Sequence, residues 1–373
     1  MKSILLKFSI LFFFLYTYQI ASGQVRLIDR GTGVPIPYAQ LISKGGLLVG
    51  ISNIHGVVNL KNIRRFALAD SDTIDIEHIS YKNLKIRLDS LKNVDKIYLS
   101  ENQILLPEIK IVPKTKAPTI LVLKGYFRSY QLENNIPKYF TDGIVEYFIK
   151  PNERGLLRMK VLQHRSYRNV KLVKLVKNRT VTVSMVAAGV PYIYKSTILK
   201  ELDKSYSIKK VSTFYDKICK DNASVGTIFL SKPLNRIQVN IDLIRPEKSK
   251  THKLFNYISR ITNIDITGNY SYEPLLSLTK EDLLSRKEFR RIYFKHKKDK
   301  KFTKIDIIDE FYVMKKWYIT KSDFRKIKTL TNFALLKSSK YSDQYWKALT
   351  KYHIPKLSTN IKRLLGTTLT PYR

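Results

Sequence analysis

The sequence predicts a mainly β protein with two regions, a small β-sandwich followed by a larger β-rich α+β domain that ends in C-terminal helices. Short apolar stretches, separated by Gly, Pro, Asn and Asp, recur at hairpin spacing in the first hundred residues. Apolar and polar residues alternate from Ile237 to Leu243, which is typical of a half-buried strand. Helical spacing is evident mainly near the C-terminus, so sheets should dominate both regions.

The N-terminus has the features of an export signal. Lys2 and Lys7 precede an uncharged apolar run, 8–18, and small residues follow at 21–23. We therefore predict a signal peptide over 1–23 that is cleaved before Gln24. A membrane anchor is the alternative, but the run is shorter than the roughly 20 residues that a spanning helix needs. We expect a mature chain without a transmembrane segment, in the periplasm or cell envelope, peripheral at the outer membrane.

Residues 24–112 predict a small all-β domain. Thr32-Gly33 and Gly56 provide turns in which glycine adopts a positive φ. The two prolines of 113–118 mark a linker, and 119–373 form the second domain. The expected strands of the first domain cover 25–28, 39–42, 57–60, 74–76, 86–88 and 97–99.

The first region also resembles a known family. Asp29 and the segment TGVPIPYA from Thr32 look like the opening hairpin of the carboxypeptidase regulatory-like domain. NIHGVVNL from Asn53, DTIDIEHISYKNLKIRL from Asp72 and LPEIKI from Leu106 are similar to its later strands, the last in the form seen in Bacteroidetes envelope proteins. The resemblance implies a transthyretin-like Greek-key β-sandwich that accompanies other domains and has no peptidase chemistry of its own.

The second region predicts strands with two short helices. One helix should begin at Ser358 or Thr359 and end at Gly366, and the other should run from Ser342 toward Pro355. Further strands are expected around 157–161, 181–183, 292–294 and 305–307. The last two flank the run 295–304 and predict a hairpin with a very basic tip.

Two segments of this region carry a second resemblance. FRSYQLENNIPKYFTDGIVEYFI from Phe127 and YSDQYWKALTKYHIPKL from Tyr341 look similar to the long region that follows the β-domain in Bacteroidetes envelope proteins. By analogy with the half-barrels of periplasmic lipid carriers, a curved or half-barrel sheet would fit this pattern.

Positive charge is concentrated in the second region. The chain has 68 Lys and Arg against 30 Asp and Glu, and the net charge is +5 in residues 24–116 but +31 in 117–373. Such an excess is more than solubility requires and favours acidic partners. The alternative is compositional drift, because enrichment in Lys, Asn, Ile, Tyr and Phe also follows from a low-GC genome and charge runs usually form solvated loops. The candidate anion-binding residues are Arg286, Lys287, Arg290, Arg291, Lys295, Lys297, Lys298, Lys300 and Lys301.

Catalytic and metal-binding motifs are not found in the sequence. None of the six histidines lies in HExxH or an HxxE pair, and the chain lacks GxSxG, GxxxxGK[ST] and GxGxxG. No cofactor, metal site or catalytic residue is therefore predicted. Adjacent Glu281 and Asp282 are interpreted as helix-start charges, and the single Cys219 as a small buried apolar residue rather than a reactive thiol. The sequence leaves open whether one catalytic site is formed by Glu133, Asp142, Glu146 and His164.

Three functions are compatible with these observations. The favoured one is a non-enzymatic envelope protein whose basic domain binds an anionic lipid, lipopolysaccharide or acidic glycan, or another envelope protein. The alternative is an envelope hydrolase or transferase with its site in the second domain. Nucleic-acid binding comes third because the predicted export argues against it.

Overall fold

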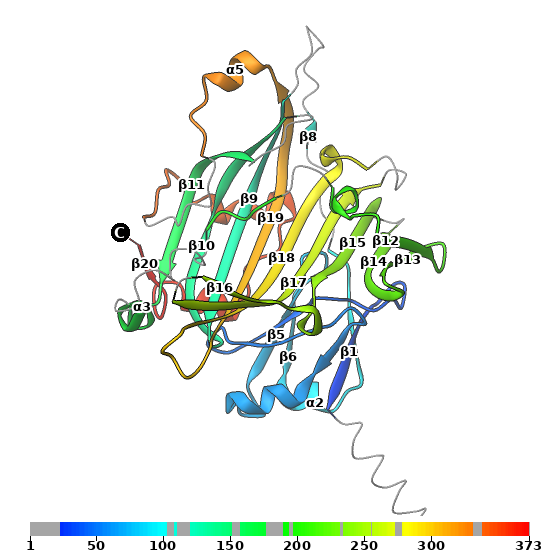
Figure 1. Cartoon of the computed structure of the whole chain (residues 1–373), viewed down its shortest axis with the longest axis vertical. Helices are drawn as coiled ribbons and strands as arrows, with labels where there is room; N and C mark the ends of the chain where they lie inside the picture. Colours follow the sequence, from blue (N-terminus) through cyan, green and yellow to red (C-terminus); the bar gives the residue numbers. More distant parts are fainter. Residues whose placement is uncertain are drawn as a thin grey trace, which may run out of the picture. The chain divides into compact units, whose positions relative to one another are not determined.

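A computed structural model describes residues 23–102, 108–109, 120–150, 157–176, 189–193, 197–231, 234–254, 256–272, 278–330 and 338–372. The predicted signal peptide, apart from Gly23, and the strand expected at 181–183 lie outside these ranges. The chain divides into two compact units, one comprising Met1–Lys44 and Leu48–Glu101, the other Gly45–Leu47 and Asn102–Arg373 (Figure 1). Each unit has a mainly β structure with few short helices.

The described part of the first unit contains seven strands in two sheets, and the six predicted strands are all confirmed. One sheet has the order β4-β1-β7, with β1 parallel to β7, and the other has the order β3-β2-β5-β6. The strands are β1 (Gln24–Asp29), β2 (Gln40–Ser43), β3 (Leu48–Ile51), β4 (Val57–Asn59), β5 (Thr73–Glu77), β6 (Leu84–Arg87) and β7 (Lys96–Leu99). The helical segments are η1 (Leu60–Phe66) and α2 (Leu88–Lys92).

Turn chemistry explains how the first strands reverse. The Asp29 carboxylate accepts hydrogen bonds from the backbone N–H groups of Gly31 and Thr32, at 3.0 and 2.8 Å, which fixes the loop after β1. Gly33 and Gly56 both have φ of +72°, as predicted from the sequence. At Gly56 a Cβ atom would lie 2.6 Å from the carbonyl oxygen of Leu27, so only glycine fits this turn without a shift.

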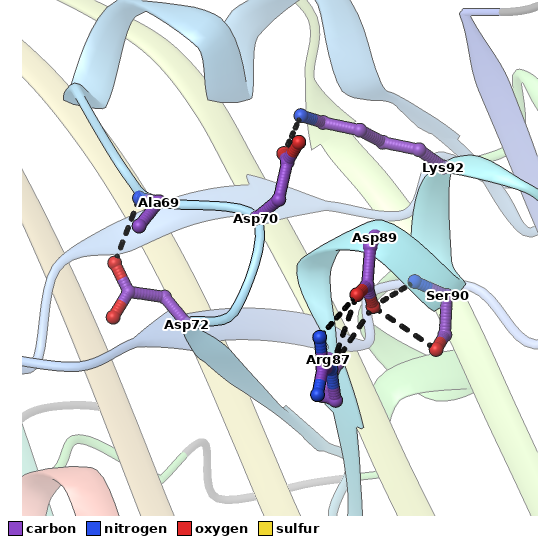
Figure 2. A network of polar contacts seen from close by, with 7 residues as sticks. All are labelled: Ala69, Asp70, Asp72, Arg87, Asp89, Ser90 and Lys92. Atoms are coloured by element: carbon purple, nitrogen blue, oxygen red, sulfur yellow. Dashed lines mark hydrogen bonds and ion pairs between the residues drawn. The ribbon is translucent and has the colours of Figure 1, made fainter.

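Exposed ion pairs connect the loop before β5 to α2, as Figure 2 shows. The Asp72 carboxylate accepts a hydrogen bond from the backbone of Ala69 at 2.9 Å, and Lys92 pairs with Asp70. Arg87 and Asp89 form a second pair, which lowers the pKa of Asp89 chiefly through the hydrogen bond. Exposed pairs of this kind contribute little to stability, so we interpret the network as a local fastening of the loop.

The second unit is built on one large sheet. Thirteen strands of its described residues join this sheet, and all pairings are antiparallel except that of β8 (Glu108–Ile109) with β19. In sheet order the main strands are β12 (Tyr206–Lys210), β13 (Tyr215–Lys220), β14 (Ala223–Ser231), β15 (Arg236–Ile244), β17 (Tyr257–Ser271), β18 (Leu283–His296), β19 (Thr303–Ile319), β9 (Ile120–Glu133), β10 (Ile136–Ile149), β11 (Arg158–Arg168) and β20 (Thr370–Pro371). The short β16 (Thr251–Leu254) pairs with β17.

Two-residue turns join neighbouring strands of this sheet. Asn134 and Asn135 link β9 to β10 with φ of 50° and 71°, and Asp221 and Asn222 link β13 to β14 with φ of 50° and 63°. Positive φ at both central positions gives the turn a twist that matches the flanking strands, and Asn and Asp tolerate it best after glycine. The local sequence therefore sets the register of both hairpins.

The large sheet is covered on both faces where its strands are longest. Ile237, Val239 and Ile241 of β15 belong to a continuous apolar cluster, which also includes Phe127 of β9 and Phe311 of β19. Gln238 and Asn240 are buried as well, so the strand predicted at 237–243 is confirmed but its expected half-buried character was wrong. Asn240 is held on this second face by Thr227 and Thr267, at 3.1 and 2.9 Å. Buried polar side chains are tolerated there because they satisfy one another.

The helices are short and lie between or after the strands. Ser358 caps α6 (Thr359–Leu364) through the N–H of Ile361, and Gly366 follows with φ of 91°, so the predicted C-terminal helix is confirmed. The helix expected from Ser342 is present as two 3₁₀ turns, η5 (Tyr345–Lys347) and η6 (Leu349–Tyr352). The remaining helical segments are α3 (Val170–Val176), α4 (Ile198–Glu201), η3 (Pro246–Lys248), η4 (Lys280–Asp282) and α5 (Lys321–Arg325). Within the described residues, no helix is long and apolar enough to cross a membrane.

The main part of the second unit starts at Asn102, and the sequence pattern placed the end of the first domain at residue 112. Glu108–Ile109, read from the sequence as the last strand of the first domain, pairs with Lys315–Lys316 of β19. A strand's partner depends on which sheet edge is available, and the short LPEIKI pattern carries no such information. The expected linker, 113–118, lies outside the described ranges.

Candidate anion-binding surface

The nine predicted anion-binding residues all lie on β18 or on the hairpin that follows it. β18 pairs with β19 so that Phe294 faces Thr303, which confirms the predicted hairpin and places its turn at 297–302. Their surroundings divide them into two groups. Arg286 and Lys287 are buried, and Arg290 and Arg291 are half-buried, whereas the lysines of the turn are exposed.

The arginine end of β18 is embedded among carboxylates. On one face Arg286 lies 3.0 Å from Glu288, which also lies 3.2 Å from Arg290. Arg290 continues the chain to Asp309 of β19 at 2.6 Å. Burial raises the pKa of Asp309, although the attraction of Arg290 lowers it. Burial therefore disfavours the charged carboxylate, and the ion pair with Arg290 stabilises it. The ion pairs therefore belong to the packing of the sheet.

The other face of β18 follows the same pattern. Arg291 binds Asp306 through two nitrogen atoms, at 2.6 and 3.2 Å, and the Asp306 side chain is fully buried. Burial alone would lower the pKa of Arg291, but the attraction of Asp306 outweighs it and raises the pKa. Lys287 stands opposite Glu310 in the register, and both Arg128 and Lys287 lower the pKa of Glu310 against the effect of burial.

The lysine end of β18 forms what we call the basic tip, Lys295–Lys301. Lys297, Lys298, Lys300 and Lys301 are exposed, and Asp299 is the only acidic residue within the tip sequence. Its carboxylate accepts a hydrogen bond from the backbone of His296 at 3.2 Å, so it serves to shape the turn. Four exposed lysines thus project from one hairpin, and the half-buried Lys295 lies at its base.

Aromatic rings support the basic tip. Phe302 is 41% exposed, and the Lys295 ammonium lies 4.8 Å from the centre of its ring. Below the turn, Tyr257 stacks on Phe294 with ring centres 5.1 Å apart. Lys253 of β16 is exposed and stands opposite Ile258 of β17. On its other side Ile258 stands opposite Lys295, so Lys253 lies near the same end of the hairpin. The basic surface therefore extends onto the neighbouring strand.

The residues considered for catalysis do not converge. Asp142 faces Arg165 in the β10–β11 register, and the adjacent His164 lies on the opposite face of the sheet because side chains alternate along a strand. Glu133 pairs with Lys138 instead. Glu146 stands opposite Lys124, and burial raises its pKa while Lys124 and Lys160 lower it. This arrangement gives none of the paired carboxylates that hydrolytic chemistry would use.

Other candidates from the sequence have structural roles. Asp282 accepts a hydrogen bond from the backbone N–H of Thr279 at 2.7 Å and completes a capping box at η4. Cys219 is buried in β13, as predicted. Among the residues that the structure describes, no group of three or more His, Cys, Asp or Glu side chains is arranged to hold a metal ion.

Sequence reasoning missed a cavity of about 370 Å³ on the second unit. It lies between the C-terminal segment 343–352 and strands β9, β10, β11 and β19. Its lining includes Lys124, Lys315 and Lys351, which are separated by up to 227 residues in the chain. No local pattern could have brought these three lysines together, because strand order places Lys124 beside Lys315 and the C-terminal segment brings Lys351 to the same cavity.

Comparison with known proteins adds no assignment. No family model matches the chain, and no curated protein matches it either.

Proposed function

We propose that this protein is an exported, non-enzymatic envelope protein that binds an anionic surface through the basic tip of its second unit. The observation that carries the proposal is the exposure of four lysines on one ordered hairpin. Lysines held in solvent attract phosphates and carboxylates over about a Debye length, roughly 8 Å at physiological salt. Ion pairs of Arg290 and Arg291 with carboxylates of β19 join the two strands of this hairpin.

A lipid surface is the anionic partner that the tip favours. An exposed aromatic ring among lysines is a feature of segments that lie at a membrane interface, where the ring inserts and the ammonium groups bind headgroups. Phe302 provides such a ring next to Lys295. An acidic glycan would use the lysines alone, so the contribution of Phe302 separates the two partners.

The proposal includes a fold for each unit. The first unit is proposed to be a transthyretin-like Greek-key sandwich of the carboxypeptidase regulatory-like type, supported by its seven described strands in sheets of three and four. Close approach of the sheets agrees with this, since a Cβ atom on Gly50 of β3 would lie 3.0 Å from Val58 of β4. For the second unit we propose a curved sheet whose apolar cluster spans strands from β11 to β13.

Binding to vesicles tests the proposed function. We would compare vesicles with and without an anionic lipid, at low and high ionic strength, using the chain from Gln24 to Arg373. Each lysine near an anionic surface contributes about 1 kcal/mol at most. Changing Lys297, Lys298, Lys300 and Lys301 to Gln should therefore weaken binding to anionic vesicles by about 10- to 100-fold, after allowance for salt screening.

A matched variant provides the control. Lys204, Lys209, Lys210 and Lys217 are also exposed in the second unit, so their change to Gln removes the same charge from another surface. This control should bind anionic vesicles nearly as well as the unchanged protein. Equal losses in the two variants would show that net charge, rather than the tip, governs binding, and equal binding to neutral vesicles would refute the proposal.

Export has a separate test. N-terminal sequencing of the protein from envelope fractions should give a first residue of Gln24, because the small residues 21–23 precede it. A membrane-bound product that retains residues 1–23 would contradict the predicted cleavage.

A further inference from the structure

The cavity on the second unit is lined by apolar and basic side chains. Ile144, Leu162, Met314 and Ala348 contribute apolar surface. Lys124, Lys315 and Lys351 approach from three different elements, β9, β19 and η6. Its volume of about 370 Å³ is at the lower end of the range for sites that bind small molecules.

The sheet side of the cavity brings two lysines together. Lys124 and Lys315 stand directly opposite each other in the β9–β19 register, and both are half-buried. Like charges at such positions repel one another. Glu146 stands opposite Lys124 on the other side, and Lys160 stands opposite Glu146 in turn. An anion in the cavity would offset this repulsion.

Buried contacts hold the opposite wall in place. The Tyr345 hydroxyl donates a hydrogen bond to Asp142 at 2.8 Å, and Asp142 is fixed by Arg165 and by the Tyr126 hydroxyl. The Arg165 guanidinium also lies 3.9 Å from the centre of the Trp346 ring. These contacts anchor η5 to the sheet, so the cavity is built before any ligand arrives.

The Gln163 side chain holds residues 342 and 343 of the same wall in place. The Gln163 carboxamide oxygen accepts a hydrogen bond from the backbone N–H of Ser342 at 2.9 Å. Its nitrogen donates to the Asp343 carboxylate at 3.2 Å. Asp343 is the one acidic residue in the lining, and this hydrogen bond orients it toward Gln163.

We propose that this cavity binds a small anionic amphiphile, a molecule that joins a phosphate or carboxylate to a single short apolar group. The anionic group would lie among Lys124, Lys315 and Lys351, and the apolar group against Ile144 and Leu162. Three lysines against one carboxylate in the lining disfavour a cation, and the apolar interior disfavours a fully polar anion. This site is separate from the basic tip and goes beyond the proposed surface binding.

Calorimetry with matched ligands tests the chemistry of the site. Octyl phosphate and octanoate, both below their micelle concentrations, should bind to the chain from Gln24 to Arg373 with one ligand per protein. Inorganic phosphate lacks the apolar group, octyl glucoside lacks the charge and octyltrimethylammonium reverses it, so each should bind at least 10-fold more weakly. Equal binding of all the octyl compounds would overturn the proposal, because it would show unspecific apolar adsorption.

Variants test the location. Changing Lys124 and Lys315 together to Gln should reduce octyl phosphate affinity at least 10-fold, and Lys351→Gln, on the exposed rim, should reduce it severalfold even if the double variant folds poorly. Lys347→Gln is the control, because Lys347 is exposed in the adjacent η5 but does not line the cavity. Ala348→Trp should block the octyl compounds by filling the cavity. Unchanged binding in Lys351→Gln and Ala348→Trp would place the ligand elsewhere.

The two sites can be separated in one experiment. The four-Lys-to-Gln variant of the basic tip should keep full affinity for octyl phosphate, and the cavity variants should keep their binding to anionic vesicles. Loss of octyl phosphate binding in the tip variant would assign that ligand to the tip and reject the cavity, whatever the vesicle result.

Discussion

The two ends of β18 are alike in sequence and opposite in environment. Arg286–Arg291 and Lys295–Lys301 are both strongly basic, and fewer than five residues separate them. The arginines lie where the sheet is covered on both faces, and they are paired with Glu288, Asp306 and Asp309. The lysines lie beyond the covered part and reach solvent. Charge in a sequence therefore indicates a binding surface only where the fold leaves it unpaired by carboxylates and exposed.

The choice of side chain agrees with this difference. Guanidinium groups bind carboxylates through two parallel hydrogen bonds, as Arg291 does with Asp306, and they are less strongly hydrated than ammonium groups. The buried positions hold mainly arginine for that reason. Lysine is a compact, strongly hydrated charge on a flexible stem, which suits the exposed tip.

The sharpest way to break this comparison is to remove an arginine that is paired with a buried carboxylate. Arg291→Gln leaves the fully buried Asp306 with Lys304, 3.4 Å away, as its remaining cation. We expect the free energy of unfolding to fall by about 3 kcal/mol, as is usual when one partner of a buried pair is lost. Urea unfolding at neutral pH measures it. Arg325→Gln, which alters an exposed arginine of α5, should change stability by less than about 0.5 kcal/mol. Equal effects would show that Arg291 has no structural role.

A second test uses pH at the carboxylates around the arginines. Asp265 faces Asp242 across β15 and β17, and burial followed by this neighbour raises its pKa well above the ordinary value, although Arg291 and Lys287 oppose the shift. Between the unfolded pKa and the raised folded pKa, the folded protein therefore binds a proton on Asp265 that the unfolded chain releases. Stability from this residue is complete below pH 4 and declines as pH rises toward the folded pKa.

Asp265→Asn should remove that decline. The variant should be more stable than the unchanged protein at pH 8, by about 1 kcal/mol for each unit of pKa shift relieved, and the difference should disappear near pH 3. Thermal unfolding over this pH range gives the measurement. A variant that is less stable at pH 8 would show that Asp265 is charged and well paired with Arg291 in the folded state.

A third test sharpens the role of the tip. Phe302→Ser removes the exposed ring beside Lys295 without changing the charge. Binding to anionic vesicles should weaken by about 3- to 10-fold, which corresponds to roughly 1 kcal/mol of lost apolar burial. Binding to a soluble sulfated glycan should stay the same. A parallel loss with both partners would favour a general effect on the hairpin over membrane insertion.

The smallest expected effect is on the stability of the lysine end. The variant with Lys297, Lys298, Lys300 and Lys301 changed to Gln should unfold within about 0.5 kcal/mol of the unchanged protein, because these side chains are exposed. We expect a slight stabilisation, since like charges at the tip repel one another. A decrease of more than about 2 kcal/mol in the free energy of unfolding, measured in urea, would show that the lysines stabilise the fold as the arginines do.

The sequence by itself determined the local features of this protein. Alternation, turn residues and caps depend on near neighbours, so six of the seven described strands of the first unit, the hairpin between 294 and 303 and the capped helix after Ser358 were predicted. The basic tip belongs to the same class, because its lysines are adjacent in the chain. A run of adjacent lysines in a turn is expected to be exposed to solvent.

Only the tertiary structure decided which charges are buried and which distant residues meet. Coverage of both sheet faces placed Arg286 in the interior and buried Gln238 and Asn240 of β15, since a strand pattern cannot show what packs against its second face. Strand order brought Lys124 next to Lys315, and residues 343–352 line the same cavity. Pairing of β8 with β19 depends in the same way on which part of a sheet is available to it. Contacts between residues far apart in the chain arise from packing, which no local pattern records.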